Sequence, residues 1–384
     1  MSNYELLGKH IKMIDARNTE SITDRVLGIN IDKFFMPSVA NVIGTDLSKY
    51  KLLTKGVFAC NPMHVGRDER LPIALYSEDD PAIVSPAYYM FIVRDESVLD
   101  RDYLMMWFRR PEFDRVCWLK TDGSVRGGLS WDDLCRMEIP VPSIDKQKHI
   151  VEMYNAITKR IELKRRINDN LDATQQALYK HYFSDYALSE QESLKDTKLG
   201  AIPSSWSIGK LSDICELLNG RAYSQDELLL SGKYRVLRVG NFFTQGNWYY
   251  SNLELEDNKY CYPDDLLFCW SASFGLYIWN DVKTIYHYHI WKIDFSKTSA
   301  IYREYIYLLL KKEVERLKHE GHGSVMAHLT KEGVEKLDIL LPSEDVVIDF
   351  HSKLLPIIEH QKTIANEIAG LQKLQSSILA QMSS

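Results

Sequence analysis

The stretch HGSVMAHLTKEGVEKLDILLP, residues 322–342, repeats the chemistry of DGSVRGGLSWDDLCRMEIPVP, residues 122–142. The Gly-Ser-Val core, one leucine, one isoleucine and the final proline are identical at a constant offset of 200, and Ser130 is matched by Thr330. Solenoid repeats recur every ~20–50 residues, so an offset this long predicts two copies of a whole domain.

Length and composition are those of an ordinary soluble protein. The chain has 384 residues, of which 45% are hydrophobic, and two or three domains of roughly 100–200 residues are expected. No apolar run reaches the ~18 residues of a membrane span, and the N-terminal sequence lacks the apolar core of a signal peptide. The six cysteines form no CxxC pair, which predicts reduced thiols and a cytoplasmic location.

The formal net charge of −6 is unevenly distributed. Residues 146–183 hold 8 Lys+Arg against 4 Asp+Glu, whereas both flanking segments are acidic. Any contact with DNA must therefore come from local basic patches and from a partner. An acidic protein that never meets DNA is the alternative.

The repeat extends beyond the opening stretch. Gly8-Lys9 matches Gly209-Lys210, and residues 102–104 match residues 304–306. Each copy is expected to begin with a short amphipathic segment and to continue through β-rich sequence. A helix then follows (103–113 and 305–318), and after it come the Gly-Ser-Val loop, a short helix and a strand that ends in proline.

A long helix is predicted after each copy. Residues 145–183 contain neither proline nor glycine, and apolar residues in both segments alternate at spacings of three and four, the heptad pattern of a coiled coil. The residues expected to pair the two helices are Ile157, Ile161, Leu171, Leu178, Leu354, Ile357, Ile364, Ile368, Leu371 and Ile378. A surface helix packed on its own domain is the alternative, but ~38 unbroken residues exceed the usual length of a globular helix.

These motifs resemble one protein family. The segment LGAIPSSWSIGKLSDICELLNG, residues 199–220, resembles the opening of a target-recognition domain in the specificity (S) subunits of type I restriction–modification systems. The two Gly-Ser-Val stretches resemble the exits of such domains into spacer helices. The resemblance covers essentially the whole chain, although the first copy lacks the IPxxW segment of the second.

The resemblance implies an α+β fold with two homologous mixed α/β target-recognition domains. Two long helices, packed as an antiparallel coiled coil, would separate them. The expected boundaries are 1–145 for the first recognition domain, 146–183 for the central helix, 184–198 for a linker, 199–343 for the second recognition domain and 344–384 for the C-terminal helix.

The resemblance also implies a non-catalytic subunit that gives a type I restriction–modification complex its DNA specificity. Each recognition domain would read one half of a bipartite double-stranded DNA target. The helices would set the spacing and dock two DNA adenine methyltransferase (M) subunits. No cofactor is expected in this chain: S-adenosylmethionine would belong to the M subunits, and ATP with Mg²⁺ to optional restriction (R) subunits. A ~35-residue helix spans ~50 Å, which is on the order of 15 base pairs.

Polar loops between strand-like runs supply candidate DNA contacts in both copies. Base readout needs paired donors and acceptors, and positioning on DNA needs cations on phosphates. The candidates of the first copy are His64, Arg67, Arg70, Lys120, Thr121, Ser124 and Arg126. Those of the second are Arg235, Arg238, Asn241, Thr244, Gln245, Asn247, Ser271, Ser273, Lys318, His322, Ser324 and Met326. For each residue a solvated surface position is the alternative, and the aromatic residues between Trp270 and Trp291 are interpreted as sheet core and sheet face.

Two other classes of function compete with DNA recognition. A coiled-coil adaptor would bind proteins through its duplicated domains and would show no DNA specificity. A metal-dependent nuclease would use Asp264, Asp281 and Lys283, a PD-(D/E)xK-like set that can hold Mg²⁺ and activate water. Because this pattern is short and has no equivalent in the first copy, we predict no catalytic residue and no metal site.

Overall fold

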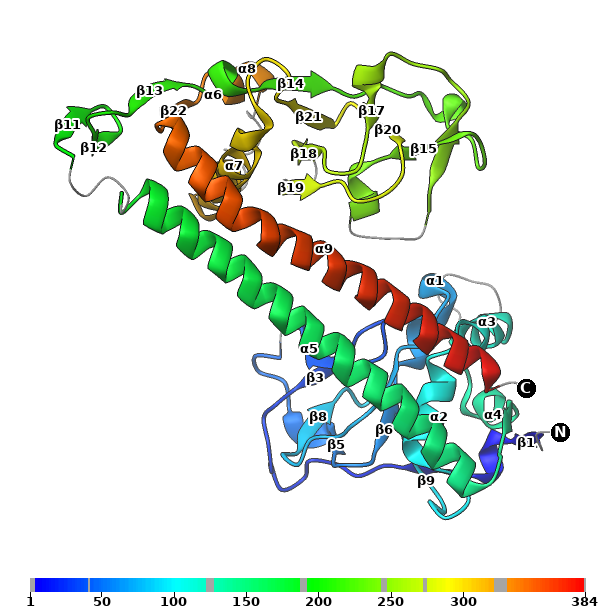
Figure 1. The fold of residues 1–384 in the computed structure, drawn as a ribbon. Helices are drawn as coiled ribbons and strands as arrows, with labels where there is room; N and C mark the ends of the chain where they lie inside the picture. Colours follow the sequence, from blue (N-terminus) through cyan, green and yellow to red (C-terminus); the bar gives the residue numbers. More distant parts are fainter. Residues whose placement is uncertain are drawn as a thin grey trace. The chain divides into compact units, whose positions relative to one another are not determined.

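The computed structural model describes residues 4–40, 42–121, 128–186, 192–242, 247–271, 275–320 and 330–382 (Figure 1). The side chains of His64 and of residues 317–320 lie outside this description. The chain divides into two compact units: the first comprises Met1–Lys164 and Glu367–Ser384, and the second comprises Arg165–Asn366. Among the described helices, none combines the length and the apolar character needed to cross a membrane.

The first unit contains a four-stranded antiparallel sheet in the order β2-β9-β6-β7. Its strands are β2 (Ile11–Ile14), β9 (Tyr89–Val93), β6 (Phe58–Cys60) and β7 (Ile73–Leu75). β6 is buried along its whole length, as a short, wholly apolar run predicts. The rings of Phe58 and Phe91 stack at 5.0 Å and belong to the main core of this unit.

A second group of strands completes the β-structure of the first unit. β5 (Lys51–Leu53) pairs with β8 (Ala82–Val84), and β3 (Leu27–Ile29) pairs with β4 (Phe35–Pro37), in both cases antiparallel. A parallel bridge between Val26 and Ile83 joins the two pairs. The resulting order is β4-β3-β8-β5.

The second unit repeats both strand orders. Its first sheet has the order β14-β21-β18-β19, with strands β14 (Glu216–Asn219), β21 (Ile290–Asp294), β18 (Leu266–Cys269) and β19 (Gly275–Ile278). Its second sheet has the order β16-β15-β20-β17, with strands β16 (Tyr249–Ser251), β15 (Tyr234–Leu237), β20 (Thr284–Tyr286) and β17 (Tyr260–Cys261). As in the first unit, the bridge in the middle of this second sheet, between β15 and β20, is parallel. The duplicated sequence therefore corresponds to a duplicated fold.

The repeated stretch forms the same capped helix and strand in both units. Ser130 caps α4 (Trp131–Cys135) by accepting the Asp133 N–H, and Thr330 caps α8 (Lys331–Glu335) by accepting the Gly333 N–H. The strands that follow, β10 (Glu138–Pro140) and β22 (Asp338–Leu341), pair antiparallel with β1 (Tyr4–Leu6) and β13 (Ser207–Lys210). Capping and strand pairing therefore explain why residues 129–142 and 330–342 are alike.

Two details differ from the sequence-based expectation. The helix expected over 103–113 is two helices, because α2 (Arg101–Phe108) ends before Pro111 and α3 (Pro111–Leu119) begins at it. Proline interrupts a helix but fits the first turn of the next one. The matching helix of the second unit, α7, runs unbroken over Arg303–Glu320. Within the expected linker, β11 (Leu194–Thr197) forms a hairpin with β12 (Gly200–Pro203).

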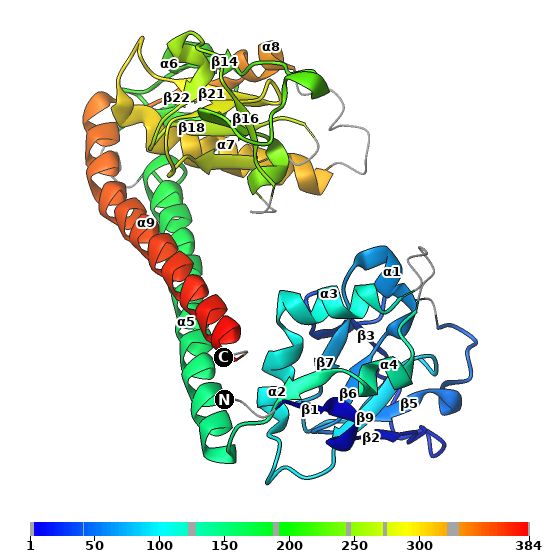
Figure 2. The ribbon, with the colours of Figure 1, turned by 90° about the vertical axis from the view of Figure 1, so that its right-hand side faces the viewer.

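Two long helices follow β10 and β22: α5 (Ile144–Phe183, 40 residues) and α9 (Glu344–Gln381, 38 residues). Within each unit they lie side by side (Figure 1 and Figure 2). In the first unit Gln375 donates to Thr158 at 2.7 Å, and Lys164 pairs with Glu367. In the second unit Gln175 donates to Gln361, and Tyr182 to Asp349. Because later residues of α5 meet earlier residues of α9, the two helices are antiparallel in both units.

All ten residues expected to pair the helices are buried or half-buried. Ile161 and Ile364 are 5% and 2% exposed. Ile378 packs against the main core of the first unit, and Leu178 and Leu354 belong to or pack against that of the second. Some of these side chains therefore contact the domain as well as the partner helix, and the pairing of each individual residue stays a prediction.

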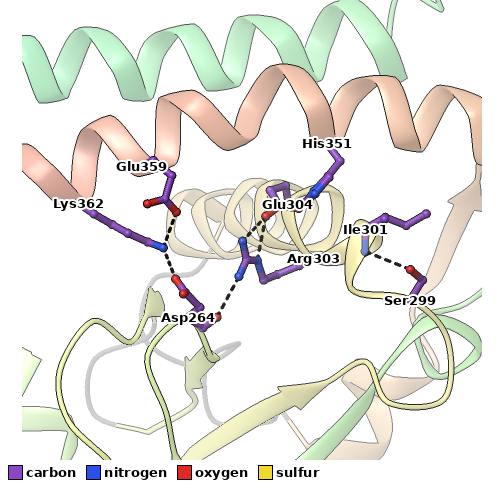
Figure 3. Close-up of polar contacts among 8 residues, drawn as sticks. All are labelled: Asp264, Ser299, Ile301, Arg303, Glu304, His351, Glu359 and Lys362. Carbon is purple, nitrogen blue, oxygen red and sulfur yellow. Dashed lines mark hydrogen bonds and ion pairs between the residues drawn. The ribbon is translucent and has the colours of Figure 1, made fainter.

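Figure 3 shows the hydrogen bonds and ion pairs that join α9 to the rest of the second unit. The fully buried carboxylate of Glu304, on α7, lies 2.6 Å from Nδ1 of His351 on α9 and accepts hydrogen bonds from the Arg303 guanidinium. Farther along α9, Lys362 pairs with Glu359 at 2.8 Å and with Asp264. Just before α7, Ser299 accepts the Ile301 N–H at 3.4 Å. The cationic partner makes burial of the Glu304 carboxylate tolerable.

Candidate nucleic-acid interface

In the first unit, the turn after β6 lies beside Gly128 and Leu129, the first described residues after the predicted Gly-Ser-Val loop. A 3-10 turn, η3 (Pro62–His64), follows β6, and Asn61 caps it by accepting the Met63 N–H. The Leu129 N–H donates to the Pro62 carbonyl oxygen at 3.1 Å, so the chain that leaves residues 122–127 continues beside this turn. A Cβ at Gly128 would lie 3.3 Å from the same oxygen, a tight approach that glycine relieves.

The arginines predicted in this region are exposed and held in surface ion pairs. Arg67, in α1 (Val65–Asp68), pairs with the adjacent Asp68 at 2.6 Å, and Arg70 pairs with Asp32 at 3.1 Å. Exposed pairs of this kind contribute ~0–1 kcal/mol. A DNA phosphate can therefore replace the carboxylate partner at little cost.

An open cleft near these arginines has balanced charge. It is lined by four cationic and four anionic side chains: Lys33, Arg70, Arg109 and Arg115, and Asp32, Asp68, Glu69 and Asp114. Lys33 and Asp114 form a buried pair at 2.6 Å, and burial lowers the pKa of the Lys33 amine. A cleft with balanced charge has no net attraction for phosphate, so the cleft as a whole is not a candidate DNA surface, and only its exposed Arg70 remains a candidate phosphate contact.

The remaining predicted residues of the first unit either follow α3 or lie outside the described residues. Lys120 is exposed at the end of α3, and Thr121 is occupied locally, because its Oγ1 donates to the Trp118 carbonyl oxygen at 2.7 Å. Ser124, Arg126 and the side chain of His64 lie outside the described residues.

In the second unit, the predicted arginines and asparagines surround the loop after β15. Arg238 directly follows β15, and its N–H donates to Asn241 Oδ1 at 2.9 Å. Asn241 also donates to the Asn247 carbonyl oxygen at 3.1 Å, so both ends of its side-chain amide are occupied by hydrogen bonds within the protein. The guanidinium of Arg238 lies 5.2 Å from the Tyr249 ring centroid.

The other candidates of the second unit fall into three groups. Arg235 pairs with Asp281 at 2.6 Å and lies over the Trp248 ring at 5.2 Å. Asn247 is exposed and Ser271 is half-buried. Outside the described residues lie Thr244, Gln245, Ser273, His322, Ser324, Met326 and the side chain of Lys318.

The structure adds a turn that the sequence analysis missed, the β20–β21 turn (His287–His289). Tyr288 is 39% exposed, and its ring lies 3.9 Å from that of His289 between centroids. Trp270, which follows β18, donates through Nε1 to the Tyr288 carbonyl oxygen at 2.9 Å, and its ring lies 5.3 Å from that of His289. The alternation of aromatic residues predicts Trp270 and Tyr288 as sheet residues, and no motif in the sequence points to the histidines. The signal was a short His-Tyr-His segment between two strands.

The backbone of this turn is fixed from three sides. The His287 N–H donates to the Leu237 carbonyl oxygen at 2.9 Å, the Trp270 N–H to that of His289 at 3.2 Å, and the Tyr288 N–H to that of Arg221 at 3.0 Å. A Cβ at Gly220 would lie 2.4 Å from the His287 carbonyl oxygen. Only glycine therefore lets the segment before Arg221 approach so closely.

The two histidines of the turn are neutral at physiological pH. Burial lowers the pKa of His287 to about 4, and the nearby His289 and Arg238 act in the same direction. Burial and Arg238 also lower the pKa of His289. A neutral imidazole carries one hydrogen-bond donor and one acceptor. It can therefore form hydrogen bonds with the donors and acceptors on the edge of a base.

The residues of the nuclease-like pattern do not form a common site. Asp264 pairs with Lys362 (Figure 3), Asp281 pairs with Arg235, and Lys283 lies over the Tyr260 ring at 4.0 Å. Within the described part of the chain, His, Cys, Asp and Glu side chains form no cluster of three that is suited to a metal ion. The six cysteines are free, and burial raises the pKa of Cys60 to about 12.

Comparisons with known proteins agree on one family. The family model "Type I restriction modification DNA specificity domain" matches residues 203–369. The MjaIX specificity subunit of Methanocaldococcus jannaschii is 22% identical over 79% of this chain and 72% of its own length. The HindI specificity subunit of Haemophilus influenzae is 20% identical over 88% of this chain and 87% of its own length.

A solved structure has the same fold. The crystal structure of a type I restriction–modification S subunit from M. genitalium superimposes with a TM-score of 0.56 at 12% identity, over 99% of this chain and 96% of the other. At this identity the likeness concerns the fold alone. The matches in sequence to the specificity domain and to full-length subunits agree with each other: this chain is similar to type I restriction–modification specificity subunits, and its residues 203–369 match their DNA specificity domain.

Proposed function

We propose that this chain recognises a bipartite double-stranded DNA sequence as the specificity subunit of a type I restriction–modification complex. The observation that carries the proposal is the duplicated strand order whose matching sheet ends carry different polar side chains. A common frame presents its end to DNA in the same way twice, while different side chains suit two different half-sites. Each α/β domain is thus assigned one half of the target.

The long helices are assigned two further roles, to set the spacing between the half-sites and to dock two M subunits. An α-helix rises ~1.5 Å per residue, so the 40 residues of α5 extend about 60 Å. Leu163 on α5 and Leu374 on α9 are 57% and 50% exposed in the first unit, so apolar side chains of both helices are accessible to a partner subunit.

No chemical step is assigned to this chain. Methyl transfer to adenine would belong to the M subunits, which would bind S-adenosylmethionine, and ATP with Mg²⁺ would serve any R subunits. The net charge of −6 opposes tight binding to a polyanion, so the M subunits are expected to complete the grip on DNA. The Asp264–Lys362 and Asp281–Arg235 pairs favour this assignment over the nuclease, since each carboxylate already has a cationic partner.

The test is a genome-wide map of N6-methyladenine in cells that express this chain with the M subunit of its own system. Cells with the M subunit alone are the control. We expect a split motif that appears only when the chain is present. Replacing residues 1–145 by the first domain of a relative with a different target should change one half of that motif and leave the other half unchanged.

Two outcomes would count against the proposal. Methylation that does not depend on the chain would leave the adaptor as the better interpretation. Mg²⁺-dependent cleavage by the purified chain, abolished in Asp264→Asn and Asp281→Asn variants, would favour the nuclease.

A further inference from the structure

We propose that the β20–β21 turn, His287–His289, together with Trp270, contacts bases and determines the sequence preference of the second domain. The inference rests on the proposed function, because it names the side chains by which one of the two domains reads its half-site.

The first support is the position of the turn among polar groups with access to solvent. Tyr288 is 39% exposed, and His289 and Trp270 are half-buried. The Trp270 ring stacks on the Trp291 ring of β21 with 5.5 Å between centroids, so its position is fixed. Ser271 follows Trp270 directly, and Arg238 lies close enough to depress the pKa of both histidines. Base-contacting groups and a phosphate-binding cation are therefore available at one sheet end.

The second support is rigidity. Main-chain hydrogen bonds join the turn to the segments ending at Leu237, Arg221 and Trp270, and the close approach at Gly220 packs one of these segments against it. A side chain presented from a fixed backbone loses little freedom on binding. Discrimination between bases depends on such fixed geometry, because a mobile group adapts to the wrong base as well.

The third support is the chemistry of the side chains. The neutral imidazole of His289 and the hydroxyl of Tyr288 each offer a donor and an acceptor. The rings of Tyr288 and Trp270 offer apolar surface for a thymine methyl group. The cation at Arg238 suits a phosphate or a guanine edge.

The fourth support is the matching segment of the first unit. Ser85–Tyr88 joins β8 to β9 as 287–289 joins β20 to β21, but it carries Pro86 and Ala87 in place of a His-Tyr-His segment. Asn61 follows β6 where Trp270 follows β18. The frame is kept and the exposed chemistry is changed, as two readers of different half-sites require.

The experiment compares the methylation motif of the wild-type complex with those of Tyr288→Phe, Tyr288→Ala and His289→Ala variants. Lys297→Ala is the matched control, since Lys297 pairs with Glu216 at the opposite end of the same sheet and is 71% exposed. Ala87→Glu changes the matching turn of the first unit and tests whether that turn affects the other half of the motif. We expect the turn variants to lower methylation at the wild-type site on the order of 10- to 100-fold and to relax one half of the motif. Ala87→Glu should affect only the other half.

The outcomes separate this inference from the function on which it rests. If the wild-type complex yields a split motif and all turn variants keep the same motif and rate, the turn is not the reader and the inference is wrong. If a turn variant relaxes both halves or Lys297→Ala has the same effect, the change reflects stability, which also overturns it. If the wild-type complex yields no split motif, the proposed function fails first. Tyr288→Phe removes one exposed hydroxyl, so it keeps the test valid should the alanine variants fold poorly.

Discussion

At the scale of single residues, burial decides what the turn histidines can do. His287 is 8% exposed, and its pKa is lowered to about 4, against ~6.5 for an unperturbed imidazole. Desolvation penalises the charged form, and a second positive charge beside Arg238 would be repelled. The buried ring therefore contributes to the stability of the fold only while it is neutral.

This leads to a prediction for stability against pH. In the unfolded chain His287 takes up a proton near pH 6.5, whereas in the folded chain it does so only near pH 4. Between these values the unfolded state binds more protons, so the free energy of unfolding falls as the pH is lowered from ~6.5 to ~4, by roughly 2–3 kcal/mol at most. Urea denaturation of the wild type and of His287→Asn across this range measures it. The variant should show a shallower slope, and equal slopes would contradict the burial argument.

Single residues were predictable from sequence where the cause is local. The match of Ser130 with Thr330 has a local cause, since both hydroxyls cap the helix that begins at the next residue. The role of His289 was not predictable, because its neighbours Trp270 and Arg238 are brought to it by pairing between strands far apart in sequence. The spacing of residues along the chain does not show which distant strands pair.

At the scale of elements, the helix pair shows the same division between local and tertiary causes. Residues 145–183 were expected to be one helix, and α5 covers Ile144–Phe183, because heptad spacing and the lack of breakers act locally. The break before Pro111 also has a local cause, because proline fits the first turn of a helix but not its interior. The single helix expected over 103–113 did not take this proline into account. The polar contacts of Gln175 with Gln361 and of Gln375 with Thr158 depend on register between the helices, which a single sequence does not fix.

The seam between the helices yields the second prediction. Ile161→Ala and Ile364→Ala should each lower the free energy of unfolding by ~2–4 kcal/mol, because both side chains are almost fully buried and their truncation leaves a cavity. Leu163→Ala, on the same helix but 57% exposed, should change it by less than ~0.5 kcal/mol. Chemical denaturation followed by circular dichroism measures all three. A loss at Leu163 as large as that at Ile161 would show that the outer face is also covered.

At the scale of the whole molecule, the two units have the same strand orders, and each unit contains a segment of both long helices. Each unit contains an α/β body and a segment of both helices, since α5 passes from the first unit to the second after Lys164, and α9 passes from the second to the first after Asn366. Lys164 and Glu367, which stand next to these two points, pair with each other. The duplication was visible in the sequence from residues 122–142 and 322–342 alone. The identical order of both sheets was not, because the strands themselves share little sequence.

The proposed spacing role of the helices gives the last prediction. Seven residues inserted after Lys164 in α5, together with seven after Asn366 in α9, would lengthen both helices by two turns and keep their heptad register, because seven residues complete one heptad. The added rise is about 10 Å, equivalent to at most ~3 base pairs. Under the proposed function, the methylation motif should keep both half-sites and gain one to three unread positions between them. An insertion in α5 alone breaks the register and is the control, for which we expect lost or reduced methylation. A lengthened pair that supports the original spacing would show that something other than the helices sets the distance between the half-sites.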